Sequence, residues 1–149
     1  MTEAITDRDA IERLMNAYCF TIDAGDLAAF SDLFSNGYWG VVGDPNGFAH
    51  GSEALARVME SIILYDGKPR TRHLMTNVDI RVEPGAKTAT AESYVMVMQA
   101  VPPDFPLQAI FVGRYADRFE CNDGQWTFAA REIHAELFGD LSWHRSDMG

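Results

Sequence analysis

Two residues that often do acid–base chemistry together stand far apart in this sequence, Asp23 and His73. A neutral imidazole is the most versatile proton donor and acceptor near pH 7. Asp23 falls in the last turn of a predicted helix, where the macrodipole disfavours a carboxylate by about 0.3–1 kcal/mol. If it points into a pocket, it can orient a histidine and stabilise its charged form. The alternatives are a histidine bonded to a loop carbonyl and an ordinary turn aspartate.

Tyr18 and Arg131 are further candidates. Tyr18 precedes Asp23 by five positions, and a buried tyrosine hydroxyl needs a hydrogen-bond partner. Tyr18 also fits a plain core position on the helix. Arg131 follows an apolar run, so its guanidinium requires a counter-charge or an anionic ligand. A surface salt bridge is the simpler alternative for Arg131.

The elements that must position these residues change character near residue 72. Before it, helical spacing and capping residues predict a helix from a capping box at 6–9 to Gly25, helices over 27–34 and 52–63, and a strand over 38–42. After it, alternation predicts strands over 72–83, 88–99, 107–120 and 125–138. This order indicates an α+β fold whose curved, mainly antiparallel sheet leaves a pocket beside the helices.

In the strand that carries His73, the alternation of apolar residues disagrees with an inward-facing His73. Strict alternation places an apolar set on the face opposite His73: Leu74, Thr76, Val78, Ile80 and Val82. If His73 faces the pocket, either a bulge occurs near positions 75–77 or the outer face is buried in an oligomer.

Composition excludes several classes of function. The 149 residues suit one domain, 1–149, with its core over about 5–140. Asp and Glu number 22 against 12 Lys and Arg, a net charge of −10, so we expect neither nucleic acid nor a membrane as partner. We expect the protein to be cytoplasmic, because it has two lone thiols, Cys19 and Cys121, and a polar N-terminus without signal-peptide character. The four histidines show no metal-ligand spacing and no glycine-rich phosphate loop occurs, so we expect no metal and no cofactor.

Six short motifs follow one another in an order that is specific in combination: Tyr18-Cys-Phe-Thr-Ile-Asp23-Ala-Gly-Asp26, Leu33-Phe34, Gly51-x-Glu53, Arg72-His73 with Asn77, Gly113-Arg-Tyr115-Ala-Asp117, and Asp123-Gly-Gln-Trp126. Together they resemble the SnoaL-like group of the nuclear-transport-factor-2-like superfamily. The resemblance covers about residues 5–140. It implies a cone-shaped barrel, with N-terminal helices packed on a strongly curved sheet around a deep apolar pocket.

The resemblance also implies roles for the candidate residues. Scytalone dehydratase, bile acid 7-alpha-dehydratase and hexachlorocyclohexane dehydrochlorinase share an aspartate–histidine dyad, and Asp23 and His73 fall on its two positions. His73 would be the general base, Asp23 its orienting partner and Tyr18 a hydrogen-bond donor to the substrate. Arg131 would stabilise developing negative charge. Segment 92–98 carries neither the second histidine of scytalone dehydratase nor the matching aspartate of the bile acid enzyme.

The sequence thus favours a cofactor-independent lyase, of dehydratase or dehydrohalogenase type, or an isomerase, acting on a hydrophobic cyclic small molecule. The alternative is a non-catalytic ligand-binding protein, or an accessory subunit resembling the small subunit of aromatic-ring dioxygenases. Met and aromatic side chains adapt to flat apolar ligands. The expected substrate-binding residues are Phe30, Trp39, Leu55, Met59, Met96, Met98 and Phe111.

Two expectations concern surfaces. Apolar residues on both faces of the long strands predict a homo-oligomer, a trimer or a dimer, with contacts from Ile110, Val112, Ile133 and Leu137. Segment 139–149 contains Trp143, whose large apolar ring has little use in a disordered tail. We expect this segment to cover the pocket mouth or a neighbouring subunit. In the other interpretation, Trp143 only pins the terminus to the outer surface.

Overall fold

The computed structural model describes residues 4–85 and 87–148, which contain three helices and six strands. In chain order they are α1 (Asp7–Ala24), α2 (Leu27–Asp32), β1 (Tyr38–Val41), β2 (Ala49–His50), α3 (Gly51–Met59), β3 (Thr71–Val82), β4 (Thr88–Val101), β5 (Phe105–Asn122) and β6 (Gln125–Phe138). The strands form one sheet in the order β2-β1-β6-β5-β4-β3, and only the β1–β6 pair is parallel among the described strands. The predicted α+β class is confirmed. Residues 1–3 and 149, the ends of the predicted domain and of segment 139–149, lie outside the described residues.

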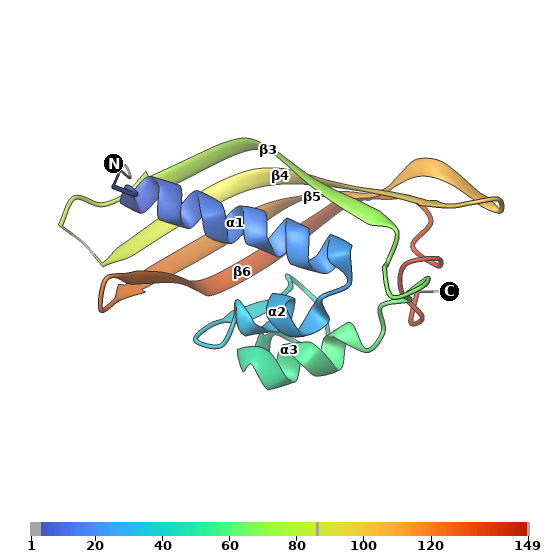
Figure 1. Ribbon diagram of the computed structural model, residues 1–149, viewed down its shortest axis with the longest axis horizontal. Helices are drawn as coiled ribbons and strands as arrows, with labels where there is room; N and C mark the ends of the chain where they lie inside the picture. The colour runs from blue at the N-terminus through green and yellow to red at the C-terminus, as the bar shows by residue number, and fades with distance from the viewer. Residues whose placement is uncertain (1–3, 86, 149) are drawn as a thin grey trace.

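The helices cover one face of the curved sheet (Figure 1). α1 packs mainly against β3, with further contacts to β6, whereas α2 and α3 lie at the side of β6 (Figure 1). The third helix ends at Met59, four residues before its predicted end. Beyond it, Ile62 pairs with Arg145, and the Ile63 N–H donates to the His144 carbonyl. A tertiary contact with the end of the chain therefore replaces the last turn of this helix. None of the described helices is long and apolar enough to cross a membrane.

Local capping fixes the position of α1. The Thr6 hydroxyl accepts from the backbone N–H of Asp9, whose side chain accepts in return from the Thr6 N–H, so the predicted capping box is present. At the other end, Gly25 adopts a left-handed conformation with φ 78° and stops the helix as predicted. A side chain at Gly25 would collide with the Gly67 backbone. The helix end is thereby held against the loop that leads into β3.

A bulge in β3 explains how both His73 and the later apolar residues of this strand can face the helices. The pairing of β3 with β4 shifts between Thr76 and Asp79, and Asn77 has a φ of 54°. Before the bulge, His73 and its alternate neighbours face the helices; after it, Ile80 and its alternate neighbours do. Leu74 is consequently left on the outer face, 48% exposed. Of the two alternatives for this strand, the bulge near 75–77 is the one found in the structure.

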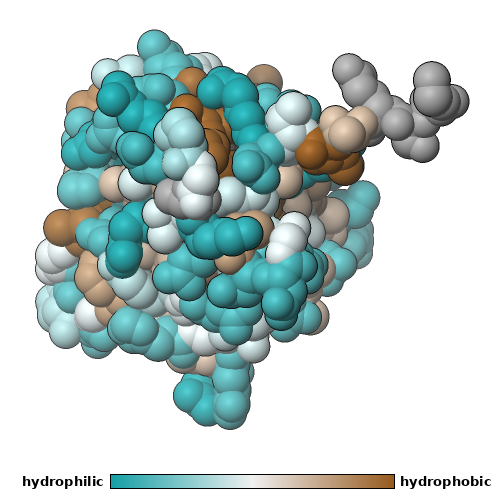
Figure 2. Space-filling model, turned by 90° about the vertical axis from the view of Figure 1, so that its left-hand side faces the viewer, coloured by the Kyte–Doolittle hydropathy of each residue, from teal (hydrophilic) through white to brown (hydrophobic). Residues whose placement is uncertain are grey.

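The outer sheet face keeps part of the expected apolar character. Val112 and Leu137 lie there beside Leu74 and Met96 in a shallow groove. Ile110 and Ile133, the other expected contact residues, are instead buried inside the protein, so their assignment to an outer contact surface is wrong. Elsewhere, the end of the molecule near the N-terminus of α1 is mostly hydrophilic, in keeping with the acidic composition (Figure 2).

Candidate active site

Asp23, in the last turn of α1, and His73, near the start of β3, are hydrogen-bonded to each other. The His73 Nδ1 lies 2.7 Å from Oδ1 of Asp23, and the His73 backbone N–H donates to Oδ2 at 2.8 Å. The Thr71 hydroxyl also donates to Oδ1, at 2.8 Å. The side chains of His73 and Asp23 are only 8% and 10% exposed. The predicted contact between these two distant residues is confirmed.

The surroundings of Asp23 keep it ionised. Burial acts to raise the pKa of Asp23, but the hydrogen bonds from His73 and Thr71 and the charge of His73 outweigh burial and lower this pKa. An ionised carboxylate accepts hydrogen bonds, so it favours the His73 tautomer with its proton on Nδ1. The second nitrogen, Nε2, is then free to accept a proton.

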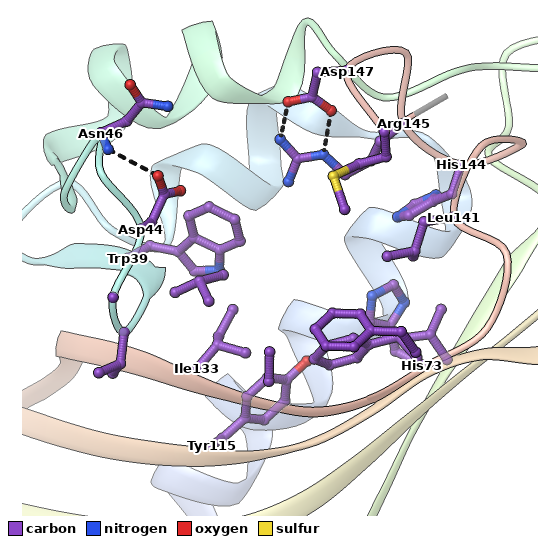
Figure 3. Close-up of a pocket in the computed structure, with 18 of the residues that line it drawn as sticks. Trp39, Asp44, Asn46, His73, Tyr115, Ile133, Leu141, His144, Arg145 and Asp147 are labelled. Carbon is purple, nitrogen blue, oxygen red and sulfur yellow. Dashed lines mark hydrogen bonds and ion pairs between the residues drawn. The ribbon is translucent and has the colours of Figure 1, made fainter.

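His73 lines a cavity of about 570 Å³ between the sheet and the chain segments that close over it (Figure 3). Most of its wall is apolar and comes from β1, β4, β5 and β6, whereas the exposed side chains Asp44, Asn46 and Asp147 lie at its mouth. The polar residues that line its interior are Tyr18, His73, Tyr115, His144 and the half-buried Arg145. An apolar cavity with few polar groups suits a small ligand whose orientation those groups determine.

Tyr18 places a hydroxyl in this cavity. Its oxygen accepts the Trp39 indole N–H at 3.0 Å, and the ring of Tyr115 lies 5.6 Å away, edge to face. Burial raises the pKa of both tyrosines, although the positive charge of Arg131 acts in the opposite direction. Both hydroxyls are therefore protonated at neutral pH and can donate hydrogen bonds.

Arg131 lies behind these tyrosines and not among the cavity-lining residues. It is fully buried and bonds Asp117 through two nitrogens, each at 2.8 Å. Its guanidinium carbon is 4.2 Å from the centroid of the Tyr18 ring and 3.8 Å from that of Tyr115. Arg131 does not line the cavity, so the expectation that it would stabilise developing negative charge there is corrected. The surface salt bridge is wrong as well, because Asp117 on the neighbouring strand β5 supplies a buried counter-charge.

Of the seven expected substrate-binding residues, Trp39 and Phe111 line the cavity. Phe30, Leu55 and Met59 are core residues with at most 3% exposure; Phe30, for example, packs against the Tyr18 ring at 4.7 Å. Met96 and Met98 alternate with the inward-facing residues of β4, so they point to the outer face, and Met96 is 40% exposed. Hydrophobic type alone did not distinguish cavity wall, core and outer face.

The sequence did not assign Tyr115 or His144 to the site, nor Asp44, Asn46 and Asp147 at its mouth. Tyr115 stands in one of the quoted motifs and alternates with Gly113 and Asp117, a pattern that could have indicated its inward facing. His144 lies in the segment expected to cover the pocket, and Leu141, Arg145 and Met148 of that segment also line the cavity. Trp143 instead stacks on Phe105 at 5.4 Å. The segment therefore both covers the cavity and is pinned by its tryptophan.

Among residues 4–85 and 87–148, no three His, Cys, Asp or Glu side chains gather as they would around a metal ion. The site consists of an aspartate–histidine pair, a second histidine and two tyrosines around an apolar space.

Comparison with known proteins agrees with this architecture. The family model for a SnoaL-like domain matches residues 3–132. Two structures from Novosphingobium aromaticivorans are each 25% identical with a TM-score of 0.71. One is a nuclear-transport-factor-2-like protein with a cystatin-like fold (87% of this chain, 81% of that chain). The other is provisionally named scytalone dehydratase (90% and 87%).

A third structure, from Catenulispora acidiphila in complex with S-DNPA, is 19% identical with a TM-score of 0.68, over 86% of this chain and 92% of that chain. A search of curated proteins gives no significant match. The family model spans most of the chain, and the fold match to the first of these structures covers 87% of it. The chain therefore belongs to the SnoaL-like domain family of the nuclear-transport-factor-2-like superfamily.

Proposed function

We propose that this protein is a cofactor-independent acid–base enzyme, a lyase of dehydratase or dehydrohalogenase type or an isomerase, acting on a hydrophobic cyclic small molecule. The observation that carries the proposal is the Asp23–His73 hydrogen bond of 2.7 Å at the wall of a largely apolar cavity. A buried carboxylate that orients a histidine is a standard arrangement for a general base.

In this proposal each residue of the site has a role. The Nε2 of His73 accepts a proton from a substrate carbon, and the resulting imidazolium is stabilised by the Asp23 carboxylate. The electron pair left on carbon forms a new double bond, and the Tyr18 hydroxyl donates to the substrate oxygen that gains negative charge. In a lyase the double bond forms as a hydroxide or halide departs from the adjacent carbon. In an isomerase the proton returns from His73 to a different carbon.

Dehydration is the reaction to test first, because a relative that is 25% identical is provisionally named scytalone dehydratase. Purified protein is incubated with cyclic alcohols, halides and enones, and products are followed by mass spectrometry. We expect turnover of at least one alcohol or halide. A ligand that binds without turnover would instead support a non-catalytic binding protein, and recovery of a large Rieske-type partner would support an accessory subunit.

The dyad variants make this experiment decisive. The conversion His73→Gln removes the base and Asp23→Asn weakens its orientation, so we expect each to lower kcat by roughly 10²–10⁴-fold. The matched control is His134→Gln, because His134 is a half-buried histidine that does not line the cavity. Equal activity in the dyad variants and the control would contradict the proposed function.

We also infer that the protein acts in the cytoplasm as a homo-oligomer, a dimer or a trimer. Both cysteines, Cys19 and Cys121, are free and buried, which suits a reducing compartment. On the outer sheet face, Leu74, Tyr94 and Leu137 are each about half exposed or more around one groove. A second copy of the chain would remove this apolar surface from water.

A further inference from the structure

His144 is a second imidazole in the cavity, contributed by the segment after β6. It is only 8% exposed, and its ring centroid lies 6.4 Å from that of His73. Figure 3 shows the rings of His144 and His73 on one side of the cavity, with Trp39 on the opposite side. Both imidazoles thus face the same enclosed space.

The backbone around His144 is firmly attached to the rest of the protein. The His144 carbonyl accepts from the Ile63 N–H at 2.9 Å, and the next turn is held by a bond from the Ser146 N–H to the Ser61 carbonyl. The Trp143 carbonyl accepts from the hydroxyl of Tyr65 at 2.6 Å and from the Gln99 amide at 3.2 Å. The placement of the His144 ring is therefore built into the fold.

The His144 ring lacks the partners that a buried imidazole requires. Its Nδ1 is buried without a hydrogen-bond partner among the described residues. Leaving such an atom unsatisfied costs about 1–3 kcal/mol. A buried N–H without a partner is rarer than a buried acceptor without one, so the proton belongs on Nε2. His144 then presents one N–H donor to the cavity.

Among the described residues, no unpaired lysine or arginine side chain lines the cavity, so an anionic ligand would find no such partner there. Burial, together with the charges of His73 and Arg145, lowers the pKa of His144 to about 4, so this ring is neutral at pH 7. Arg145 is already bonded to both oxygens of Asp147, at 3.0 and 2.8 Å. The exposed Asp44 adds negative charge to the mouth. Neutral ligands are consequently favoured over carboxylates or phosphates.

We propose that His144 is a ligand-binding residue whose Nε2–H donates a hydrogen bond to a hydroxyl or carbonyl oxygen of a neutral ring compound held beside His73. The inference deepens the proposed function, on which it rests for the location of the ligand. The C-terminal segment thereby selects among apolar ring compounds those that carry an oxygen at this position. A ring compound of the same shape without that oxygen would leave the donor unpaired and would bind more weakly.

The test compares two probes of similar size, 2-naphthol and 2-methylnaphthalene, by equilibrium dialysis at pH 7. We expect the wild-type protein to prefer 2-naphthol by roughly 3- to 10-fold, the value of one neutral hydrogen bond. The conversion His144→Leu should abolish that preference without weakening the binding of 2-methylnaphthalene. His144→Gln, which keeps a polar N–H near the Nε2 position, should retain part of it. Nitrogen NMR should show the His144 ring signals moving with 2-naphthol only.

Three outcomes would overturn the inference. The wild type could bind neither probe, His144→Leu could keep the wild-type preference for 2-naphthol, or His144→Leu could lose affinity for both probes equally. The last result would mean that His144 only supports the structure. Because no turnover is measured, the two proposals can fail separately. If the protein shows no turnover but has the His144-dependent preference for 2-naphthol, this inference holds and the proposed function fails. If it turns over substrate but lacks that preference, the proposed function holds and this inference fails.

Discussion

Trp39 donates its indole N–H to the hydroxyl oxygen of Tyr18 across 3.0 Å. Since the indole nitrogen can only donate, the proton of Tyr18 is left for another acceptor. A hydroxyl that accepts one hydrogen bond becomes a stronger donor in the next. We therefore expect Tyr18→Phe to lower kcat by on the order of 10²-fold with little change in KM, in steady-state assays of a substrate found with the panel above.

The companion variant Trp39→Phe separates the two residues. It removes the indole donor but leaves the Tyr18 hydroxyl, so its effect on kcat should be smaller than that of Tyr18→Phe. A phenylalanine at position 18 that turns over substrate at the wild-type rate would contradict the assigned role of Tyr18.

The Arg131–Asp117 pair predicts a large effect on stability. Both side chains have no exposed surface and are joined by two hydrogen bonds of 2.8 Å. Breaking a buried pair leaves one charge uncompensated, so Asp117→Asn should lower the free energy of unfolding by about 3–5 kcal/mol in urea titrations. The double variant Arg131→Met/Asp117→Leu should recover much of that loss, because no unpaired charge then remains. A loss in the double variant as large as in the single one would contradict the explanation that the loss comes from an unpaired buried charge.

Histidine 144 gives the protein a defined pH dependence of stability. Burial and the charge of His73 lower the pKa of His144 from 6.5 to about 4, against the opposing charge of Asp23. Between these values the unfolded chain binds a proton that the folded chain does not. The stabilisation is therefore fully present above pH 6.5 and is lost as pH falls towards 4, by about 3 kcal/mol in total.

The variant His144→Gln lacks this titration. In urea unfolding, the difference in stability between wild type and His144→Gln should change by about 3 kcal/mol in favour of the variant between pH 7 and pH 4. Asp23, whose pKa is lowered, contributes its own loss only below that window. A constant difference across the window would mean that the folded His144 titrates like an exposed histidine.

Local signals explain what the sequence could predict. The cap at Thr6, the left-handed Gly25 and the alternation around Asn77 each act over a few residues, and all three are found in the structure. The Asp23–His73 contact depends on them, because the helix end and the strand start meet only when both elements stop and bend where they do. That contact was nonetheless predicted through the family resemblance and not through local signals alone.

The sequence could not predict which face of the sheet some strand residues point to, or which residues distant in the chain pair with each other. β4 alternates without interruption from Ala89 to Gln99, and its outward positions include the apolar side chains of Met96 and Met98. Because both faces of this strand carry hydrophobic residues, the sequence holds no signal of which face is the inner one, and it wrongly predicts these two methionines in the pocket. The partner of Arg131 lies on another strand, and His144 reaches the cavity through contacts of a segment without regular structure.

The stacking of Trp143 on Phe105 should hold the C-terminal segment in place. With Trp143→Ala we expect the free energy of unfolding to fall by about 2 kcal/mol, from lost apolar burial. The same variant should also lose the preference for 2-naphthol, because the segment that carries His144 is loosened. Deletion of residues 140–149 should reproduce both effects. Full stability after deletion would show that the segment contributes nothing to the fold.

The outer sheet face should be an interface between copies of the chain. Leu74, Tyr94, Met96 and Leu137 surround one groove there and are 48%, 51%, 40% and 64% exposed. We expect light scattering at micromolar concentration to give a dimer or trimer. Met96→Glu should shift it to the monomer, because each copy would bring a new carboxylate into an apolar contact. The control Phe20→Glu changes a residue that is 75% exposed on α1, on the opposite side of the sheet, and should leave the mass unchanged. A monomeric wild type would contradict self-association, and an oligomeric Met96→Glu variant would place its interface on another surface.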